Sequence, residues 1–324
     1  MKLYEIQEPG KIDSLVETTR PDPVPGPGQA LVKVKAVSLN YRDLLMAKGG
    51  YGRNVPLPLV PLSDGAGEVA AVGPGVARVK AGDRVAGIFM QAWIAGELTE
   101  AKARSAMGGA IDGMFAEQVV LSEEGLVRIP PHLSFEEAAT LPCAAVTAWH
   151  ALILEGGLRP GETVLLLGTG GVSMFALQFA KLSGARIIAT SSSDEKLDRA
   201  RKMGAHETIN YRKTPDWDKA VRELTGGVGV DHVVEVGGAG TLGRSVKAVR
   251  MNGRVLLIGV LAGGADFNPN PVLMRNIRLQ GIYVGSREMF EGMNRALETH
   301  QIRPVVDRVF TFDRAHDAYR YMES

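Results

Sequence analysis

The chain has 324 residues, more than a single hydrophobic core usually supports, so two domains are expected. A hydrophobic content of 45% and a charged content of 23% are typical of globular proteins and argue against disordered or fibrous architectures. The formal net charge is +1, with neither a basic run nor an acidic tail, so neither nucleic acid nor an anionic membrane is expected as a partner.

The first residues contain no apolar core of signal-peptide length, and no apolar run of about 18 residues occurs anywhere, which predicts a cytoplasmic protein. Cys143 is the only cysteine, so an internal disulfide and a cysteine-cluster zinc site are excluded. The six histidines show no close metal-ligand spacing, and no metal site is predicted.

The first part of the chain, to about residue 144, reads as β-rich, with strand-like runs at 30–37 and 68–72 separated by proline and glycine. The polar stretch 38–45 follows a strand, which is where a β scaffold commonly presents a site. The same stretch could equally be a helix start capped by Asn40.

A segment of irregular pattern, residues 90–114, fits neither the helical nor the strand period. A long loop inside a compact domain is usually a lid or a binding loop. Trp93 and Met114 could line a cavity there, or they could anchor the loop to the core.

From Gly161 onward, short apolar runs alternate with helical spacing, which predicts a parallel, doubly wound sheet of the dinucleotide-binding kind. The expected strands are 164–167, 185–190, 207–210, 232–236, 255–259 and 279–284. Ligands of such sheets bind beyond the strand C-termini, here near Gly168, Ser191, Val236 and Gly259. A helix at 288–299 and a strand-like run at 305–312 are expected to return to the first domain.

A glycine turn joins the first of these strands to a helix. Gly168 and Gly170 would let a phosphate approach bare backbone, and the apolar residues that follow recur at helical spacing. The sixth position of the fingerprint is Ser173 instead of glycine, so the turn alone could also be an ordinary strand–helix connection.

The end of the second strand discriminates between cofactors, because a carboxylate there binds the ribose 2′-hydroxyl and repels a 2′-phosphate. Here the strand ends in Ser191-Ser192-Ser193, with Lys196 close behind and Tyr211-Arg212 after the next strand, a set that suits a phosphate. Alternatively, Ser193 or Asp194 caps a helix and Lys196 is solvated. Because capping and phosphate binding can coexist, NADP(H) is expected over NAD(H).

Nearly the whole chain resembles the medium-chain dehydrogenase/reductase superfamily, in its zinc-free quinone oxidoreductase-like branch. The motifs that carry the resemblance are Leu39-Asn-Tyr-Arg-Asp43, Ser63-Asp-Gly-Ala-Gly-Glu68, Ala81-Gly-Asp-Arg-Val85, Leu141-Pro-Cys-Ala-Ala-Val-Thr-Ala-Trp149 and the glycine turn. By motif position, the three ligands of the family's catalytic zinc fall on Asn40, Ser63 and Cys143, and its structural zinc lobe falls within 90–114, where there is no cysteine. The resemblance therefore implies that both zincs are absent.

The resemblance further implies a GroES-like β-rich catalytic domain (1–144 and 285–324) and a Rossmann domain (145–284), with the nicotinamide between them and a homodimer through the Rossmann sheet edge. It places Thr147 near the carboxamide end of the cofactor, Gly259 and Val260 beside the nicotinamide, and Asn40, Tyr41, Arg42 and Tyr51 around the substrate. The expected cofactor-binding residues are Thr147, Gly168, Thr169, Gly170, Gly171, Val172, Ser191, Ser192, Lys196, Tyr211, Gly259 and Val260.

Without a metal, hydrogen-bond donors would have to stabilise the oxyanion that forms when hydride arrives, and Asn40, Arg42 and Tyr51 are the candidates. A quinone or an α,β-unsaturated carbonyl spreads this charge, so hydride transfer from NADPH to such a small-molecule substrate is the expected reaction. Cys143 is expected to be a packed thiol, although a nucleophile is conceivable, and Asp43 and Asp64 are expected to be structural rather than an acid pair.

Two other functions stay open at this point. One is an alcohol dehydrogenase, zinc-type by ancestry, that acts on small alcohols or aldehydes with an unusual ligand set. The other is a non-catalytic NADPH-binding protein with a structural or sensing role, as happens when a fold outlasts its chemistry.

Overall fold

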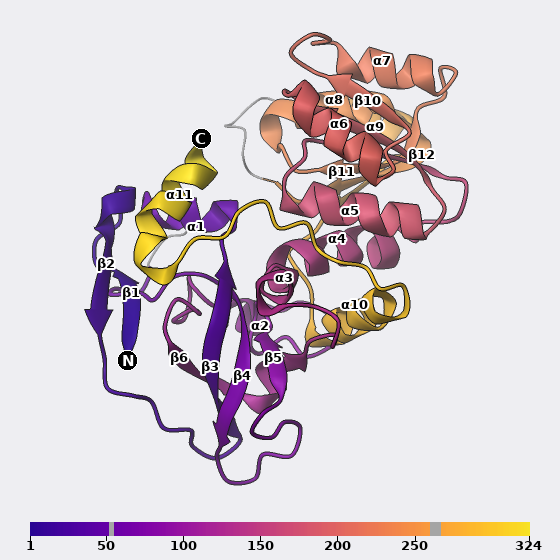
Figure 1. The fold of residues 1–324 in the computed structure, drawn as a ribbon. Helices are drawn as coiled ribbons and strands as arrows, with labels where there is room; N and C mark the ends of the chain where they lie inside the picture. The colour runs from indigo at the N-terminus through magenta and orange to yellow at the C-terminus, as the bar shows by residue number, and fades with distance from the viewer. Residues whose placement is uncertain (52–54, 260–266) are drawn as a thin grey trace. The chain divides into compact units, whose positions relative to one another are not determined.

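The computed structural model describes residues 1–51, 55–259 and 267–324 (Figure 1). The chain forms two compact units. Met1–Val146 and Gly285–Ser324 make the first, and Thr147–Val284 makes the second.

The second unit is built on a six-stranded parallel sheet with the strand order β10-β9-β8-β11-β12-β13. Its strands are β8 (Thr163–Leu166), β9 (Arg186–Ser191), β10 (Glu207–Asn210), β11 (Val230–Glu235), β12 (Val249–Leu257) and β13 (Arg278–Gly281). In chain order this is 3-2-1-4-5-6, the order of a dinucleotide-binding sheet whose connection reverses between β8 and β11. The predicted Rossmann fold is confirmed.

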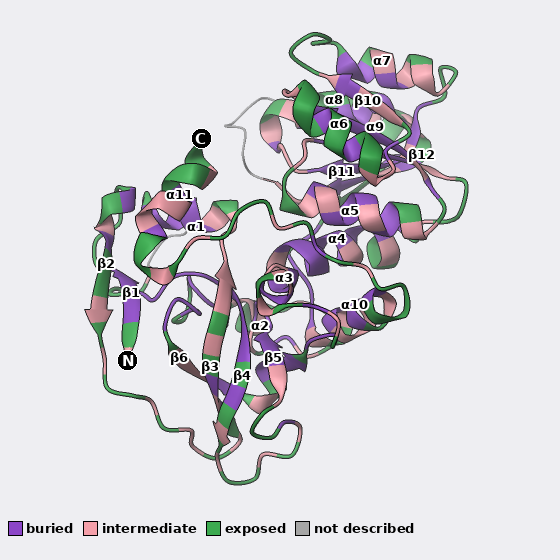
Figure 2. Cartoon of the chain, in the orientation of Figure 1, coloured by how far each residue is buried: buried purple, intermediate pink, exposed green. Residues whose placement is uncertain are grey.

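Helices precede and connect these strands, and apolar side chains of the connecting helices pack on the sheet. They are α4 (Val146–Trp149), α5 (Gly171–Leu182), α6 (Asp194–Met203), α7 (Trp217–Leu224), α8 (Ala239–Ala248) and α9 (Asn270–Met274). Leu165, Val233 and Val255, from the central strands, are fully buried in one core cluster with Val221 and Val246 from the helices. Figure 2 shows the buried interior of β11 and the exposed outer sides of α6 and α7.

The first unit contains a five-stranded antiparallel sheet with the order β6-β3-β4-β5-β7 and a separate β1-β2 pair, and this confirms the predicted GroES-like fold. The strands are β1 (Lys2–Ile6), β2 (Leu15–Thr19), β3 (Gln29–Ser38), β4 (Asp64–Val72), β5 (Arg84–Gly87), β6 (Gln118–Ser122) and β7 (Leu126–Arg128). The helices are α1 (Tyr41–Ala47), α2 (Glu100–Ala103), α3 (Phe135–Ala139), α10 (Arg287–Thr299) and α11 (Ala315–Glu323).

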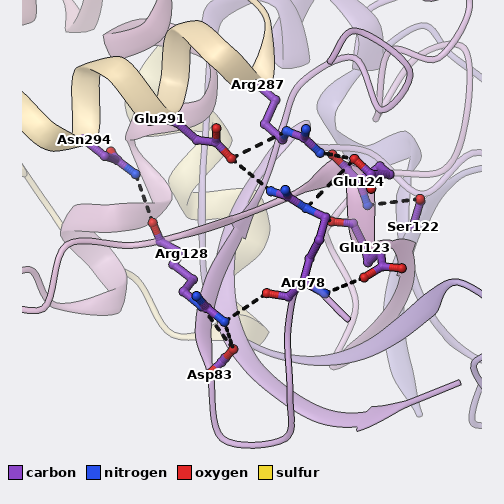
Figure 3. A network of polar contacts seen from close by, with 9 residues as sticks. All are labelled: Arg78, Asp83, Ser122, Glu123, Glu124, Arg128, Arg287, Glu291 and Asn294. Carbon is purple, nitrogen blue, oxygen red and sulfur yellow. Dashed lines mark hydrogen bonds and ion pairs between the residues drawn. The ribbon is translucent and has the colours of Figure 1, made fainter. Parts of the chain in front are cut away.

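Ion pairs and hydrogen bonds attach α10 to the β-rich part of this unit (Figure 3). Arg287 pairs with Glu124, while Glu291 accepts from the Arg78 guanidinium at 2.9 Å. Further along the helix, Asn294 Nδ2 donates to the carbonyl of Arg128 at 3.0 Å. The helix predicted at 288–299 therefore belongs to the first unit.

The strand expected at 305–312 is wrong, because residues 302–311 form neither helix nor strand. Val305 and Val309 are more than half exposed, so the apolar residues that suggested a strand do not both face a core.

The irregular segment 90–114 is held by its own buried side chains. Met114 is 1% exposed and belongs to a core cluster with Val32 and Val85 of the sheet. Trp93 is 3% exposed and its Nε1 donates to the carbonyl of Gly96 at 2.7 Å. Of the two roles considered for this pair, anchoring the loop to the core is the one the structure shows.

Candidate active site

The glycine turn after β8 exposes bare backbone at the start of α5. Gly168 has φ +72°, and Gly170 is the N-cap of the helix. A Cβ added at either position would meet nothing within 4 Å. Thr169, Gly171 and Val172 complete the turn, and the free N–H groups of a helix start favour an anionic group in this space.

Ser173 explains why the turn departs from the glycine fingerprint. Its buried hydroxyl donates to the carbonyl of Leu167 at 2.7 Å, so the serine ties the first turn of α5 back to the end of β8. The fingerprint has glycine at this position because the helix and the strand pack closely there. Ser173 is small and its hydroxyl is hydrogen-bonded internally, so it fits the same place.

Three segments meet at the C-terminal end of β9. Ser191 is buried, and its Oγ lies 3.5 Å from Oγ1 of Thr169 in the glycine turn. It also accepts from the N–H of Ser193 at 3.3 Å. The N–H of Tyr211 donates to the Ser191 carbonyl at 3.0 Å, which brings the end of β10 beside it. The structure therefore brings together the hydroxyl residues predicted at this strand end.

The helix start after Ser191 shows one of the two predicted roles, the cap, while phosphate binding stays a prediction. Ser193 caps α6 by accepting from the N–H of Lys196 at 3.4 Å. The Lys196 side chain is exposed and forms no ion pair within the described ranges. Its ammonium group is thus available to a ligand.

Two residues that bind the Asp194 carboxylate next to this cap were not predicted from the sequence. Asp194 accepts from Lys213 Nζ at 2.6 Å and from Asn210 Nδ2 at 2.7 Å. These contacts, Lys213 first, lower the pKa of Asp194. Lys213, two residues after Tyr211, was the only sequence signal. Its spacing from Asp194 does not predict that the two side chains meet beyond the end of β10.

The ends of β11 and β12 are locked together by backbone bonds. The N–H groups of Ile258 and Gly259 donate to the carbonyl of Glu235 at 2.9 and 3.0 Å. A Cβ at Gly259 would lie 1.6 Å from the carbonyl oxygen of Val236, so only glycine fits. Val260 lies outside the described residues. Thr147 is 3% exposed in α4.

Glu235 itself was not predicted from the sequence. Its Oε1 accepts from the N–H groups of Gly237 and Gly238 and from the Thr241 hydroxyl, at 2.6 to 3.0 Å. Its Oε2 accepts from the Ser245 hydroxyl. The carboxylate thereby fixes the turn between β11 and α8, and a glutamate at a strand end before two glycines was the only sequence signal.

In the first unit, Ser63 and Cys143 converge on Asp64. The Ser63 hydroxyl donates to Oδ1 of Asp64 at 2.6 Å, and the N–H of Cys143 donates to Oδ2 at 2.9 Å. Asp64 is fully buried. Burial raises the pKa of Asp64 to about 7, outweighing the hydrogen bonds that favour its charged form.

Asn40 occupies the N-cap position of α1, and its backbone N–H donates to Asp43 Oδ2 at 2.8 Å. The Asn40 side chain is close enough to Asp64 to favour the charged carboxylate. Its buried amide nitrogen nevertheless makes no well-formed hydrogen bond to the described residues. Asp43 is also buried, which raises its pKa to about 6 against the opposing effect of Arg42.

The Arg42 guanidinium is held by the irregular segment 90–114. It donates to the carbonyls of Met107 and Gly108 at 2.9 and 3.3 Å. It also lies 4.6 Å from the ring centroid of Phe89 and 5.3 Å from that of Tyr51. Arg42 and Tyr51 are therefore neighbours, and the arginine ties α1 to the loop.

A metal site would need several His, Cys, Asp or Glu side chains close together. Across residues 1–51, 55–259 and 267–324, no group of three or more His, Cys, Asp or Glu side chains is placed to hold a metal ion. In those same ranges no helix is long and apolar enough to cross a membrane.

Comparison with known proteins matches both units. Residues 26–131 match the family described as "Alcohol dehydrogenase GroES-like domain", and residues 171–299 match "Zinc-binding dehydrogenase". A zinc-type alcohol dehydrogenase-like protein of Schizosaccharomyces pombe is 48% identical over 92% of this chain and 88% of its own length. The chain belongs to the medium-chain dehydrogenase/reductase superfamily.

Relatives from this superfamily carry two kinds of names. A crystal structure of a putative alcohol dehydrogenase from Sinorhizobium meliloti 1021 superposes with a TM-score of 0.93 at 40% identity, covering 99% of this chain and 95% of that one. The quinone oxidoreductase-like protein 2 of Mus musculus is 30% identical over 95% of this chain and 85% of its own length. The chain is thus an oxidoreductase of a superfamily that uses a nicotinamide cofactor, NAD or NADP.

Proposed function

We propose that this protein is an NADPH-dependent, zinc-independent oxidoreductase that reduces a quinone or an α,β-unsaturated carbonyl compound. The observation that carries the proposal is the arrangement of Asn40, Ser63 and Cys143 around Asp64. An amide, a hydroxyl and a backbone N–H face this carboxylate, and amide and hydroxyl groups are not zinc ligands of the usual set.

The second unit has the chemistry to hold NADPH. The backbone at Gly168 and Gly170 would take the pyrophosphate, and the hydroxyl of Ser191 with the ammonium of Lys196 would take the 2′-phosphate. Bound NADPH would supply the hydride. Glu235 keeps the turn beyond β11 in place, and Gly259 allows the end of β12 to pack closely on the Val236 backbone beside it.

In the first unit, the buried amide nitrogen of Asn40 is the donor best suited to an oxyanion. It makes no well-formed hydrogen bond to the described residues, so its N–H can donate a hydrogen bond to a ligand oxygen. The donors of Arg42 already bind loop carbonyls, which gives the arginine a positioning role for α1. A conjugated substrate suits a neutral donor, since its negative charge is delocalised.

The cofactor part of the proposal is tested by reversing the charge of Lys196. We expect Lys196→Glu to weaken NADPH binding about tenfold or more and to leave NADH binding nearly unchanged, because only NADPH carries the 2′-phosphate. Fluorescence titration measures the dissociation constants of NADPH and NADH. Lys202→Glu, at an exposed position on the same helix, is the matched control. Equal losses for both cofactors, or none for NADPH, contradict the assignment.

A second candidate function is alcohol dehydrogenase activity on small alcohols or aldehydes. The names of the Schizosaccharomyces pombe and Sinorhizobium meliloti relatives favour it. Metal analysis of the purified protein separates the candidates, since stoichiometric zinc and loss of activity on chelation would support the dehydrogenase.

We also propose a homodimer formed through the edge of the Rossmann sheet. In the described ladder β13 pairs on one side only, with β12, and all four of its residues are exposed. An unpaired edge strand can pair with a second copy. Light scattering of the purified protein should give twice the chain mass, and a monomer at micromolar concentration would contradict this.

A further inference from the structure

A basic pocket lies in the second unit, along α7 and beside the C-terminal ends of α8 and α9. The hollow has a volume of about 360 Å³ and is lined by Asp218, Lys219, Arg222, Lys247 and Arg275. Four of its five lining residues are therefore cationic. The strands are parallel and α8 runs back from the C-terminal end of β11. The C-terminus of α8 therefore lies beside the N-terminal ends of the strands, at the opposite end of the sheet from the glycine turn.

The two guanidinium groups are fixed by backbone carbonyls. Arg275 donates to the carbonyl of Val246 at 2.7 Å and also binds that of Val249. Arg222 donates to the carbonyl of Lys247 at 3.3 Å and binds that of Gly227. Neither arginine forms an ion pair with a carboxylate in the parts of the chain described here. Their charges are thus positioned without being neutralised.

The remaining charges around the pocket leave it positive. Lys219 is paired with Asp216 at 2.7 Å, and Asp218 is the one carboxylate in the lining. Lys247 is exposed and forms no described ion pair. Burial, together with repulsion by Arg222, lowers the pKa of Arg275. An anion between the two guanidinium groups would relieve this repulsion.

We propose that this basic pocket binds inorganic phosphate. Each guanidinium group has five N–H donors in a fixed fork, so both can serve a tetrahedral oxyanion while they keep their carbonyl contacts. The hollow is several times larger than the roughly 30 Å³ that one water occupies, which leaves room for the ion and part of its hydration shell. The inference does not depend on the proposed function, because Arg222, Lys247 and Arg275 stand at the C-terminal ends of their helices, at the end of the sheet opposite the glycine turn.

The test is equilibrium dialysis of radiolabelled inorganic phosphate against the full-length protein, at constant ionic strength with chloride as the balancing anion. Excess NADPH is added in a second series to occupy the site at the glycine turn. We expect one saturable class of phosphate site that survives NADPH. Lys247→Glu should weaken it about tenfold or more, because reversing one charge beside the ion removes an attraction and adds a repulsion.

Lys202→Glu, with the same charge change on exposed α6, is the control and should keep the affinity within about twofold. Lys247→Glu should fold, because the new carboxylate can pair with Arg222 or Arg275, and circular dichroism checks this. Should it not fold, Lys247→Gln replaces it, with an expected loss of about threefold or more. Equal affinities in the Lys247 and Lys202 variants, or complete displacement of phosphate by NADPH, would overturn the proposal.

Discussion

Asp64 accepts hydrogen bonds from the Ser63 hydroxyl and from the N–H of Cys143 while it is shielded from solvent. Burial raises its pKa to about 7, whereas an aspartate in an unfolded chain has a pKa of about 3.9. The folded state therefore binds this proton more tightly than the unfolded state. The free energy of unfolding should fall as pH rises from about 4, and this loss should be complete above about pH 7.

Replacing Asp64 with asparagine should remove part of that pH dependence. The amide keeps an acceptor for the Cys143 N–H, and the Ser63 hydroxyl can rotate to accept from the new amide nitrogen. We expect urea unfolding between pH 5 and pH 8 to show a smaller loss of stability in Asp64→Asn than in the parent. Asp43, whose pKa is raised to about 6, keeps a residual slope in both proteins. Identical slopes would show that Asp64 ionises normally.

Residues of the candidate site were predictable where the chemistry is local. The cap at Ser193 and the exposed Lys196 were both readable from the pattern after β9. The contact between Asp194 and Lys213 was not, because it depends on how β10 pairs with β9. Likewise, the hydrogen bond from the N–H of Cys143 to Asp64 joins positions distant in sequence, and no spacing rule predicts the burial that raises the pKa of Asp64.

The turn between β8 and α5 can be tested as an element with a matched glycine pair. Gly168 and Gly161 both have positive φ, +72° and +84°, and a Cβ at either would meet nothing within 4 Å. Alanine at either position should cost about 1 to 2 kcal/mol of stability from backbone strain. Only Gly168→Ala should also weaken NADPH binding, by about tenfold or more, because its methyl group fills the space offered to the pyrophosphate.

Thermal unfolding and fluorescence titration of the two alanine variants separate strain from ligand contact. If Gly161→Ala weakened binding as much as Gly168→Ala, the turn would act through general destabilisation and not as a phosphate site. Equal NADPH affinity in both variants and the parent would remove the turn from the cofactor site altogether.

Helices and strands were predictable where the spacing of apolar residues in the sequence matches the residues that are buried in the fold. The buried strands β8, β9 and β11 matched because their apolar runs lie in the core, although β12 begins earlier than predicted, at Val249, and the exposed β13 ends at Gly281. The segment 305–312 shows the opposite case, since Val305 and Val309 are apolar but remain exposed. The loop 90–114 was undecidable from its sequence, because whether Trp93 and Met114 face a cavity or the core depends on the sheet that packs against them.

At the scale of the whole chain, the order of the motifs predicts both folds. The β-rich sheet and the doubly wound sheet each match the expected topology. What sequence order cannot give is the substrate, because the relatives include proteins named as alcohol dehydrogenases and as quinone oxidoreductases on the same fold. Fold and ancestry therefore do not decide between the two reactions, and the proposed reaction rests on the groups at Asn40, Ser63 and Cys143.

The central claim is that this chain reduces conjugated acceptors with NADPH and without a metal. The most direct measurement is NADPH oxidation by chelator-treated protein of verified zinc content, across a panel of quinones, enones and simple alcohols and ketones. We predict turnover with a quinone or an enone at zinc contents far below one per chain, and at an unchanged rate when zinc is restored. Activity confined to simple alcohols and ketones, lost on chelation and recovered with zinc, would contradict the account.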